Sequence, residues 1–170
     1  MSGYRFERLK LLVVDDNQHM RKLVSAILHA FGATQVYEAS SGERAMMLMR
    51  EMTPDVIFLD WMMEGMSGIE FAKQVRNSPT GNPYVPIIML TGHTSADCVQ
   101  QARDAGVNEF LAKPVSVKAI LARLTSVIEH PRSFVRTEMY FGPCRRRRNV
   151  EYSGPERRSE ENTIAVQAAS

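Results

Sequence analysis

Five polar residues with complementary chemistry follow apolar segments of this 170-residue chain: Asp15, Asp16, Asp60, Thr91 and Lys113. Carboxylates held close together repel one another, and a hard cation such as Mg2+ relieves the repulsion while leaving room for phosphate oxygens. A carboxylate beside such a cation can attack phosphorus and form an aspartyl phosphate. A lysine and a hydroxyl would stabilise the charge of the transferred group. These residue types therefore predict a phosphoryl-transfer site.

Short apolar segments are expected to position these side chains. The expected strands are residues 9–14, 35–39, 56–60, 87–90 and 107–112. The central segment, Val-Ile-Phe-Leu, ends on Asp60 and has the pattern of a strand buried on both faces of a parallel sheet. Because the carboxyl ends of parallel strands meet at one edge, the polar residues are expected to converge there.

Segments with helical periodicity separate the strands. Asn17, Ser95 and Ser116 are placed to cap three of the helices, and Gly32 and Gly106 to end two of them. Strict alternation of strands and helices predicts an α/β fold with helices on both faces of the sheet. We expect a five-stranded parallel sheet of order 2-1-3-4-5, a flavodoxin-like doubly wound fold, followed by an irregular tail.

The charge distribution divides the chain into two parts. Residues 1–130 contain 13 Lys/Arg and 14 Asp/Glu, whereas residues 131–170 contain 8 Arg and 5 Glu. The second part has no sustained periodicity and repeats the pattern Tyr-x-Gly-Pro-x-Arg-Arg at Tyr140 and Tyr152. We therefore expect a phosphoacceptor domain over residues 1–130 and an arginine-rich, largely disordered tail over residues 131–170.

Four consecutive arginines leave the role of the tail open: Arg145, Arg146, Arg147 and Arg148. They could bind an anionic partner, stay solvated, or fold back onto the first domain with the neighbouring aromatic residues. Two Gly-Pro pairs leave little room for a helix-turn-helix. A transcriptional regulator acting on nucleic acid through this tail is the alternative function.

Composition excludes several other classes. The chain is 44% apolar and 24% charged with a net charge of +2, which is ordinary for a globular protein. Cys98 and Cys144 form no metal-ligand or disulfide pattern. The first ten residues lack the apolar core of a signal peptide, and no segment approaches the roughly 18 apolar residues of a membrane span. We expect a cytoplasmic protein.

Four motifs together resemble the receiver domain of two-component response regulators. They are Val13-Val14-Asp15-Asp16, Leu59-Asp60-Trp61-Met62-Met63, Leu90-Thr91-Gly92 and Phe110-Leu111-Ala112-Lys113-Pro114. Their order and spacing match the family from residue 8 to about residue 129, about three-quarters of the chain. The resemblance is to chemotaxis regulators, which consist of a single receiver, here with a short basic tail.

The resemblance implies a signalling phosphoacceptor that catalyses its own phosphorylation and dephosphorylation, and not a conventional enzyme. Asp60 would be the phosphoacceptor. Asp15, Asp16, Asp60 and the backbone carbonyl of Met62 would bind Mg2+, with Asp15 acting mostly through water. The implied partners are a histidine kinase or histidine phosphotransfer protein and a downstream protein that binds near the fourth helix and fifth strand.

The resemblance also assigns the remaining site residues. Thr91 and Lys113 would contact the phosphoryl group, and Thr91 and Phe110 would form the switch. The Lys113-Pro114 bond would be cis. Glu64 departs from the family, which often has proline there, and places another carboxylate near the site. Met62 and His93 would flank the path of a hydrolytic water and tune the lifetime of the phosphoryl group.

Two enzyme classes on similar architecture fit less well. A flavodoxin needs a hydroxyl-rich loop after its first strand, where Asp15 and Asp16 would repel a flavin phosphate. A haloacid-dehalogenase-type phosphatase needs a second aspartate two residues after its nucleophile, where this chain has Met62.

Overall fold

A five-stranded parallel sheet forms the centre of the computed structural model, which describes residues 6–79, 81–145 and 163–165. Its order is β2-β1-β3-β4-β5, as predicted. The strands are β1 (Lys10–Val14), β2 (Gln35–Ala39), β3 (Val56–Asp60), β4 (Ile87–Thr91) and β5 (Glu109–Ala112). β3 and β4 are buried along their whole length, because both faces of the sheet are covered.

Four helices connect these five strands and a fifth helix follows β5, while a 3-10 turn, η1 (Phe6–Arg8), precedes β1. The helices are α1 (Gln18–Ala30), α2 (Gly42–Glu51), α3 (Gly68–Arg76), α4 (Ala96–Asp104) and α5 (Val117–Glu129). The predicted caps are confirmed: Asn17, Ser95 and Ser116 each accept a backbone N–H of the first turn. β5 begins later than the sequence predicts, because the Val107 amide donates back to the Ala102 carbonyl of α4.

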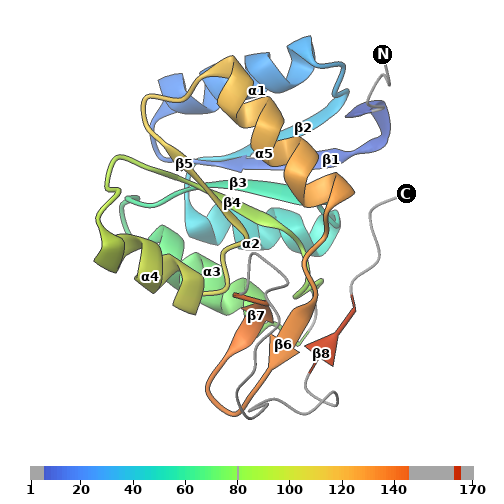
Figure 1. Cartoon of the computed structure of the whole chain (residues 1–170). Helices are drawn as coiled ribbons and strands as arrows, with labels where there is room; N and C mark the ends of the chain where they lie inside the picture. The colour runs from blue at the N-terminus through green and yellow to red at the C-terminus, as the bar shows by residue number, and fades with distance from the viewer. Residues whose placement is uncertain (1–5, 80, 146–162, 166–170) are drawn as a thin grey trace.

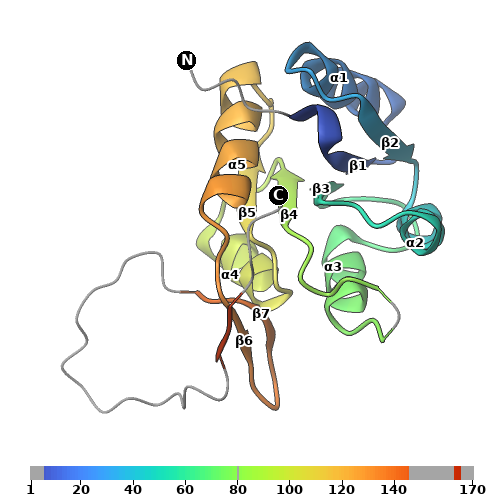
Figure 2. The ribbon, with the colours of Figure 1, turned by 90° about the vertical axis from the view of Figure 1, so that its right-hand side faces the viewer.

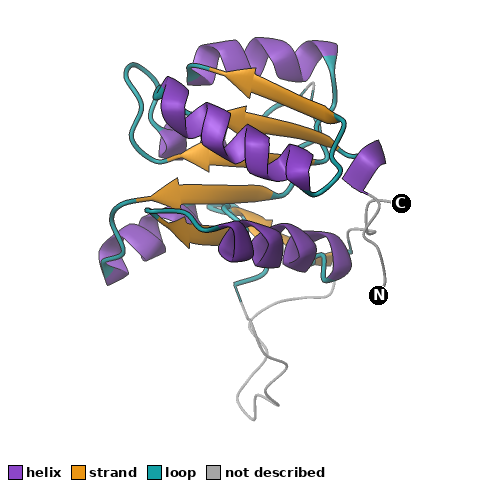
Figure 3. Ribbon diagram, turned by 90° about the horizontal axis from the view of Figure 1, so that it is seen from above, coloured by secondary structure: helices purple, strands orange, loops and turns teal. Residues whose placement is uncertain are grey.

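The helices form two layers because alternate strand residues face opposite sides of the sheet. Phe58 and Ile88 belong to a hydrophobic cluster with residues of α1 and α5. Leu59 and Met89 belong to a second cluster with residues of α2, α3 and α4. Figures 1 and 3 show the sheet between these layers.

The tail departs from its prediction. Residues 134–143, expected to be irregular, form an antiparallel hairpin of β6 (Phe134–Arg136) and β7 (Phe141–Pro143). β8 (Thr163–Ile164) pairs with the other edge of β6. Figures 1 and 2 show this small sheet beyond the amino ends of the central strands. Most of the second Tyr-x-Gly-Pro-x-Arg-Arg copy and Arg146, Arg147 and Arg148 lie outside the described residues.

Long-range packing explains the hairpin. Phe134 and Phe141 are buried, and their rings lie 5.2 and 5.4 Å from the ring of Tyr84. The Arg76 guanidinium lies 5.1 Å from the centroid of Phe134. Strands of three residues are too short to show a period in the sequence, and their partners come from residues some 50 positions away. The Gly142-Pro143 pair, which would interrupt a helix, is tolerated in a strand at a sheet edge.

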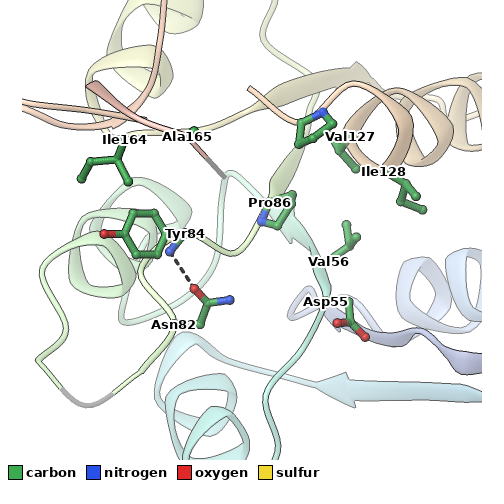
Figure 4. Close-up of a pocket in the computed structure, with 10 residues that line it drawn as sticks. Asp55, Val56, Asn82, Tyr84, Pro86, Val127, Ile128, Ile164 and Ala165 are labelled. Atoms are coloured by element: carbon green, nitrogen blue, oxygen red, sulfur yellow. Dashed lines mark hydrogen bonds between the residues drawn. The ribbon is translucent and has the colours of Figure 1, made fainter. Parts of the chain in front are cut away.

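A cavity of about 440 Å3 separates β8 from the central sheet. Its walls come from the amino ends of β3 and β4, the end of α5, and β8 (Figure 4). The lining residues are Asp55, Val56, Asn82, Tyr84, Pro86, Val127, Ile128, Pro131, Ile164 and Ala165. None of the polar residues predicted to do chemistry lines it, because those residues follow the opposite, carboxyl ends of the strands.

Candidate functional site

An acidic cluster lies at the carboxyl ends of β1 and β3. Asp15 and Asp16 directly follow β1, and Asp60 is the last residue of β3. One carboxylate oxygen from each lies within 4.8 Å of the others. β1 and β3 pair in parallel through Val14 and Leu59, which brings the residues after them to the same edge. The convergence predicted from the strand ends is thus confirmed for the three acids.

Lys113 completes this cluster from the loop after β5. Its Nζ atom donates to Oδ1 of Asp60 at 2.7 Å and to Oδ2 of Asp15 at 3.3 Å. The Lys113-Pro114 peptide bond is cis, as expected. One ammonium therefore bridges the two buried carboxylates of the cluster.

Burial sets the electrostatics of the cluster. Asp15 and Asp60 are buried, whereas Asp16 is exposed. Burial raises the pKa of Asp60, and the charges of Asp15 and Asp16 add to the rise, although the Lys113 hydrogen bond opposes it. Burial alone would lower the pKa of Lys113, but the bonds and charges of Asp60 and Asp15 outweigh it and raise the pKa. Lys113 is therefore held as a cation.

Backbone contacts fix the surroundings of the acids. The Asn17 amide donates to Oδ1 of Asp15 at 2.8 Å, and the Glu64 amide donates to Oδ2 of Asp16 at 3.0 Å. Glu64, the residue that stands where the family often has proline, thus contributes an amide hydrogen that proline lacks. Gly68 packs against the carbonyl of Asp60 so closely that a Cβ atom there would collide with it.

Thr91, the last residue of β4, and Phe110 of β5 take no part in the hydrogen bonds described for the acidic cluster. The Thr91 hydroxyl donates to the carbonyl of His93 at 3.0 Å and accepts from its amide at 2.9 Å. Phe110 is partly buried and packs against the hydrophobic cluster that includes residues of α2, α3 and α4. Met62 is 62% exposed, and His93 is also exposed. The structure therefore brings the acids into contact with Lys113, whereas the Thr91 hydroxyl is hydrogen-bonded to the backbone of His93.

The donor set suits Mg2+. Three carboxylates in reach of a single ion supply the hard oxygen ligands that Mg2+ prefers, and a cluster of this size leaves coordination positions for water and phosphate. The exposure of Asp16 gives the ion and its waters access. Asp15, Asp16 and Asp60 therefore form the kind of acidic site that binds magnesium.

Comparison with known proteins decides the family. The model of the response regulator receiver domain family matches residues 11–125, which is more than half of the chain. The chain belongs to this family. It is thus a signalling receiver domain, similar to chemotaxis regulators, and not a conventional enzyme.

Similar proteins agree with this assignment. The receiver domain is 30% identical over 121 residues to the chemotaxis protein CheY of Pseudomonas aeruginosa, covering 71% of this chain and 97% of the relative. The structure of CheY4 of Vibrio cholerae matches with 34% identity and a TM-score of 0.66, covering 70% of this chain and 98% of that one. The receiver domain of sensor histidine kinase PA1611 of Pseudomonas aeruginosa matches with 25% identity and a TM-score of 0.63, covering 69% and 94%, and has a magnesium ion coordinated in its active site cleft.

Two arginines of the receiver domain are not distinguished by any sequence pattern. Arg21 contacts the loop that carries Asp15 and Asp16, and Arg76 is buried beneath the hairpin. Each stands on a helix among other charged residues, where it looks like a solvated side chain.

Within the described ranges, no helix has the length and apolar character needed to cross a bilayer.

Proposed function

We propose that this receiver domain is a phosphorelay response regulator in which Asp60 accepts a phosphoryl group from a histidine kinase or histidine phosphotransfer protein. The observation that carries the proposal is the 2.7 Å contact between Lys113 and Asp60 beside two further carboxylates. An ion pair at the end of a buried strand provides a nucleophile, a cation for the transferred group and ligands for a metal ion in one place.

The proposed step is a displacement at phosphorus. A carboxylate oxygen of Asp60 attacks the phosphorus of a phosphohistidine, the phosphorus–nitrogen bond breaks, and the imidazole leaves with its electron pair. Asp15, Asp16 and Asp60, with the carbonyl of Met62, would hold Mg2+, which when bound neutralises charge on the phosphoryl oxygens. Lys113 would shift from the carboxylate to a phosphoryl oxygen and stabilise the same charge.

The proposed switch begins at Thr91. If its hydroxyl turns to donate to the phosphoryl group, it gives up the two hydrogen bonds to His93 and releases the start of the β4–α4 loop. Phe110, which is partly buried, would change rotamer to fill the vacated space. A downstream protein would bind the face of α4 and β5 and would distinguish the two conformations of this face.

Two exposed side chains would tune the lifetime of the phosphoryl group. Met62 and His93 both reach solvent at the loops that follow β3 and β4, where a hydrolytic water would approach. Replacing both with alanine is expected to change the dephosphorylation rate. An unchanged rate would remove this part of the proposal.

Acetyl phosphate tests the proposal directly. Incubation with acetyl phosphate and Mg2+ should give an acid-stable, base-labile phosphoryl adduct that EDTA prevents and Asp60→Asn abolishes. An adduct that survives Asp60→Asn, or no adduct on the wild-type chain, rejects Asp60 as the acceptor. A screen of histidine kinases would then identify the physiological donor.

The alternative function, regulation of transcription through the basic tail, has less support. Arg145 is the described member of the four arginines, and it is held by Asp104 at 2.6 Å and stacks on Tyr140 at 4.3 Å. A salt-independent, sequence-selective shift of a DNA fragment would favour the alternative.

A further inference from the structure

We propose that Arg21 is a positioning residue for the divalent-cation site, and this inference rests on the proposed function. Nη1 of Arg21 donates to the carbonyl of Asp15 at 2.7 Å and to the carbonyl of Asp16 at 3.2 Å. One guanidinium nitrogen therefore holds two consecutive peptide groups. The two carbonyls belong to Asp15 and Asp16, the residues that supply two of the three carboxylates.

Arg21 and Lys113 bind different atoms of the acidic residues. Lys113 binds the carboxylate oxygens themselves and so competes with a cation for them. Arg21 binds the main chain, and no ion pair joins it to the Asp15 or Asp16 carboxylate among the described residues. It leaves the carboxylate oxygens available while fixing the peptides from which they extend.

A second contact anchors Arg21 itself. Its Nε atom lies 3.7 Å from Oε2 of Glu38 on β2, and its side chain is only 13% exposed. Burial would raise the pKa of Glu38, but the hydrogen bond from Lys22 and the charges of Lys22 and Arg21 lower it. Glu38 therefore remains ionised and keeps the guanidinium pointed at the loop.

Besides the amides of Asn17 and Glu64, which donate to the Asp15 and Asp16 carboxylates, two further contacts limit the same loop. The Asp15 amide donates to the Ala39 carbonyl at 3.2 Å, and Asn17 caps α1. These contacts hold the ends of the loop, whereas Arg21 holds the carbonyls between them. Loss of the Arg21 contacts would therefore allow the peptides of Asp15 and Asp16 to rotate and would loosen the alignment of their carboxylates.

Electrostatics and positioning predict opposite results when Arg21 is removed. A cation near three carboxylates disfavours a second cation, so charge alone predicts tighter Mg2+ binding without Arg21. Positioning predicts weaker binding, because partners that orient metal ligands typically change affinity by about 10- to 100-fold. The sign of the change therefore decides between the two roles.

The test is a titration of Arg21→Met with Mg2+, in which the fluorescence of Trp61 reports binding of the ion. Trp61 is the single tryptophan of the chain and directly follows Asp60. We expect the dissociation constant for Mg2+ to rise about tenfold. The matched control is Lys22→Met, because Lys22 pairs with the same Glu38 at 3.2 Å but its side chain is 67% exposed and makes no described contact with the loop. An unchanged or lower dissociation constant in Arg21→Met overturns the inference.

A second variant and a second readout protect the test. Glu38→Gln leaves Arg21 in place but weakens its anchor, so Mg2+ binding should weaken less than in Arg21→Met; unchanged affinity there contradicts the anchoring role. At saturating Mg2+, the phosphorylation rate of Arg21→Met with acetyl phosphate should rise toward the wild-type rate, because the defect lies in Mg2+ binding and Arg21 touches no reacting atom. A persistent loss of rate would assign Arg21 another role. A wild-type chain without any Mg2+ response would reject the proposed function instead.

Discussion

Lys113 donates to the carboxylate of Asp60 at 2.7 Å, although 53 residues separate them in the sequence. The same ammonium reaches Asp15, which lies 98 positions away. Because β5 and β3 flank β4 in one parallel sheet, the loops that follow them open at the same edge. The pairing neutralises part of the charge that the acids bring together, so its loss should change both catalysis and metal binding.

Replacing Lys113 with glutamine should slow phosphorylation but strengthen Mg2+ binding. Loss of the cation is expected to slow phosphorylation by acetyl phosphate about 10²-fold, the typical cost of losing one donor to a developing charge. It should also tighten Mg2+ binding, because an ion that competes for the carboxylates is gone. Lys118→Gln, an exposed lysine of α5, serves as the control. Weaker Mg2+ binding in Lys113→Gln would contradict the competition.

Asp60 should destabilise the metal-free protein at neutral and alkaline pH. Folding raises its pKa, so the folded state holds the proton more tightly, and ionisation above that pKa costs stability. In EDTA at pH 8, Asp60→Asn is expected to raise the Tm by about 2–4 °C, the shift that 1 kcal/mol gives at this size. The gain should shrink as the pH falls through the raised pKa of Asp60.

Thermal unfolding measured by circular dichroism tests this dependence, in buffers from about pH 3.5 to about pH 8, because ordinary and raised carboxyl pKa values fall within that range. Glu7→Gln changes an exposed carboxylate and should show no comparable gain at the alkaline end. A gain for Asp60→Asn that stays constant over the whole range would show that ionisation of Asp60 is not its cause.

Arg76 should be essential for stability although it lies far from the chemistry. Its guanidinium donates to the carbonyls of Pro83, Val85 and Gly106 and to Oδ1 of Asn108. Burial lowers its pKa, but guanidinium starts so high that it stays charged at neutral pH. Arg76→Met would remove the side-chain donor of the three carbonyls, although Oδ1 of Asn108 would still accept from the Ile87 amide, and would cost at least about 3 kcal/mol.

Urea unfolding measures that cost. Lys73→Met, one turn earlier on α3 and exposed, should change the free energy of unfolding by less than about 0.5 kcal/mol. Equal effects of the two variants would mean that the carbonyl network around Arg76 contributes nothing specific.

The hairpin should contribute to the stability of the whole domain. Phe134 packs between Tyr84, Phe141 and the Arg76 guanidinium. Phe134→Ala is expected to cost about 3–5 kcal/mol in urea unfolding and to expose β6 and β7 to limited proteolysis. Met139→Ala, at a hairpin position that is 98% exposed, should behave like the wild type. Proteolysis that is equally slow in both variants would contradict tight docking.

Much of the site was predictable because its residues mark the ends of strands. The apolar segments before Asp15, Asp60 and Thr91 identify buried strands, and alternation with helices gives the order of the sheet. The positions of the acids therefore followed from local patterns. Arg21 and Arg76 did not, because a buried arginine that binds carbonyls has the same sequence context as a solvated one.

The sequence by itself determined the parallel α/β sheet, the residues that stand at its carboxyl edge and the family of the chain. Periodicity, turns and motif spacing are local properties, and they carry this information. Only the tertiary structure decided which distant partners meet: Lys113 with Asp60 and Asp15, and Phe134 with Arg76. Such contacts, the ordered hairpin included, depend on how separate elements pack, and no local pattern records that.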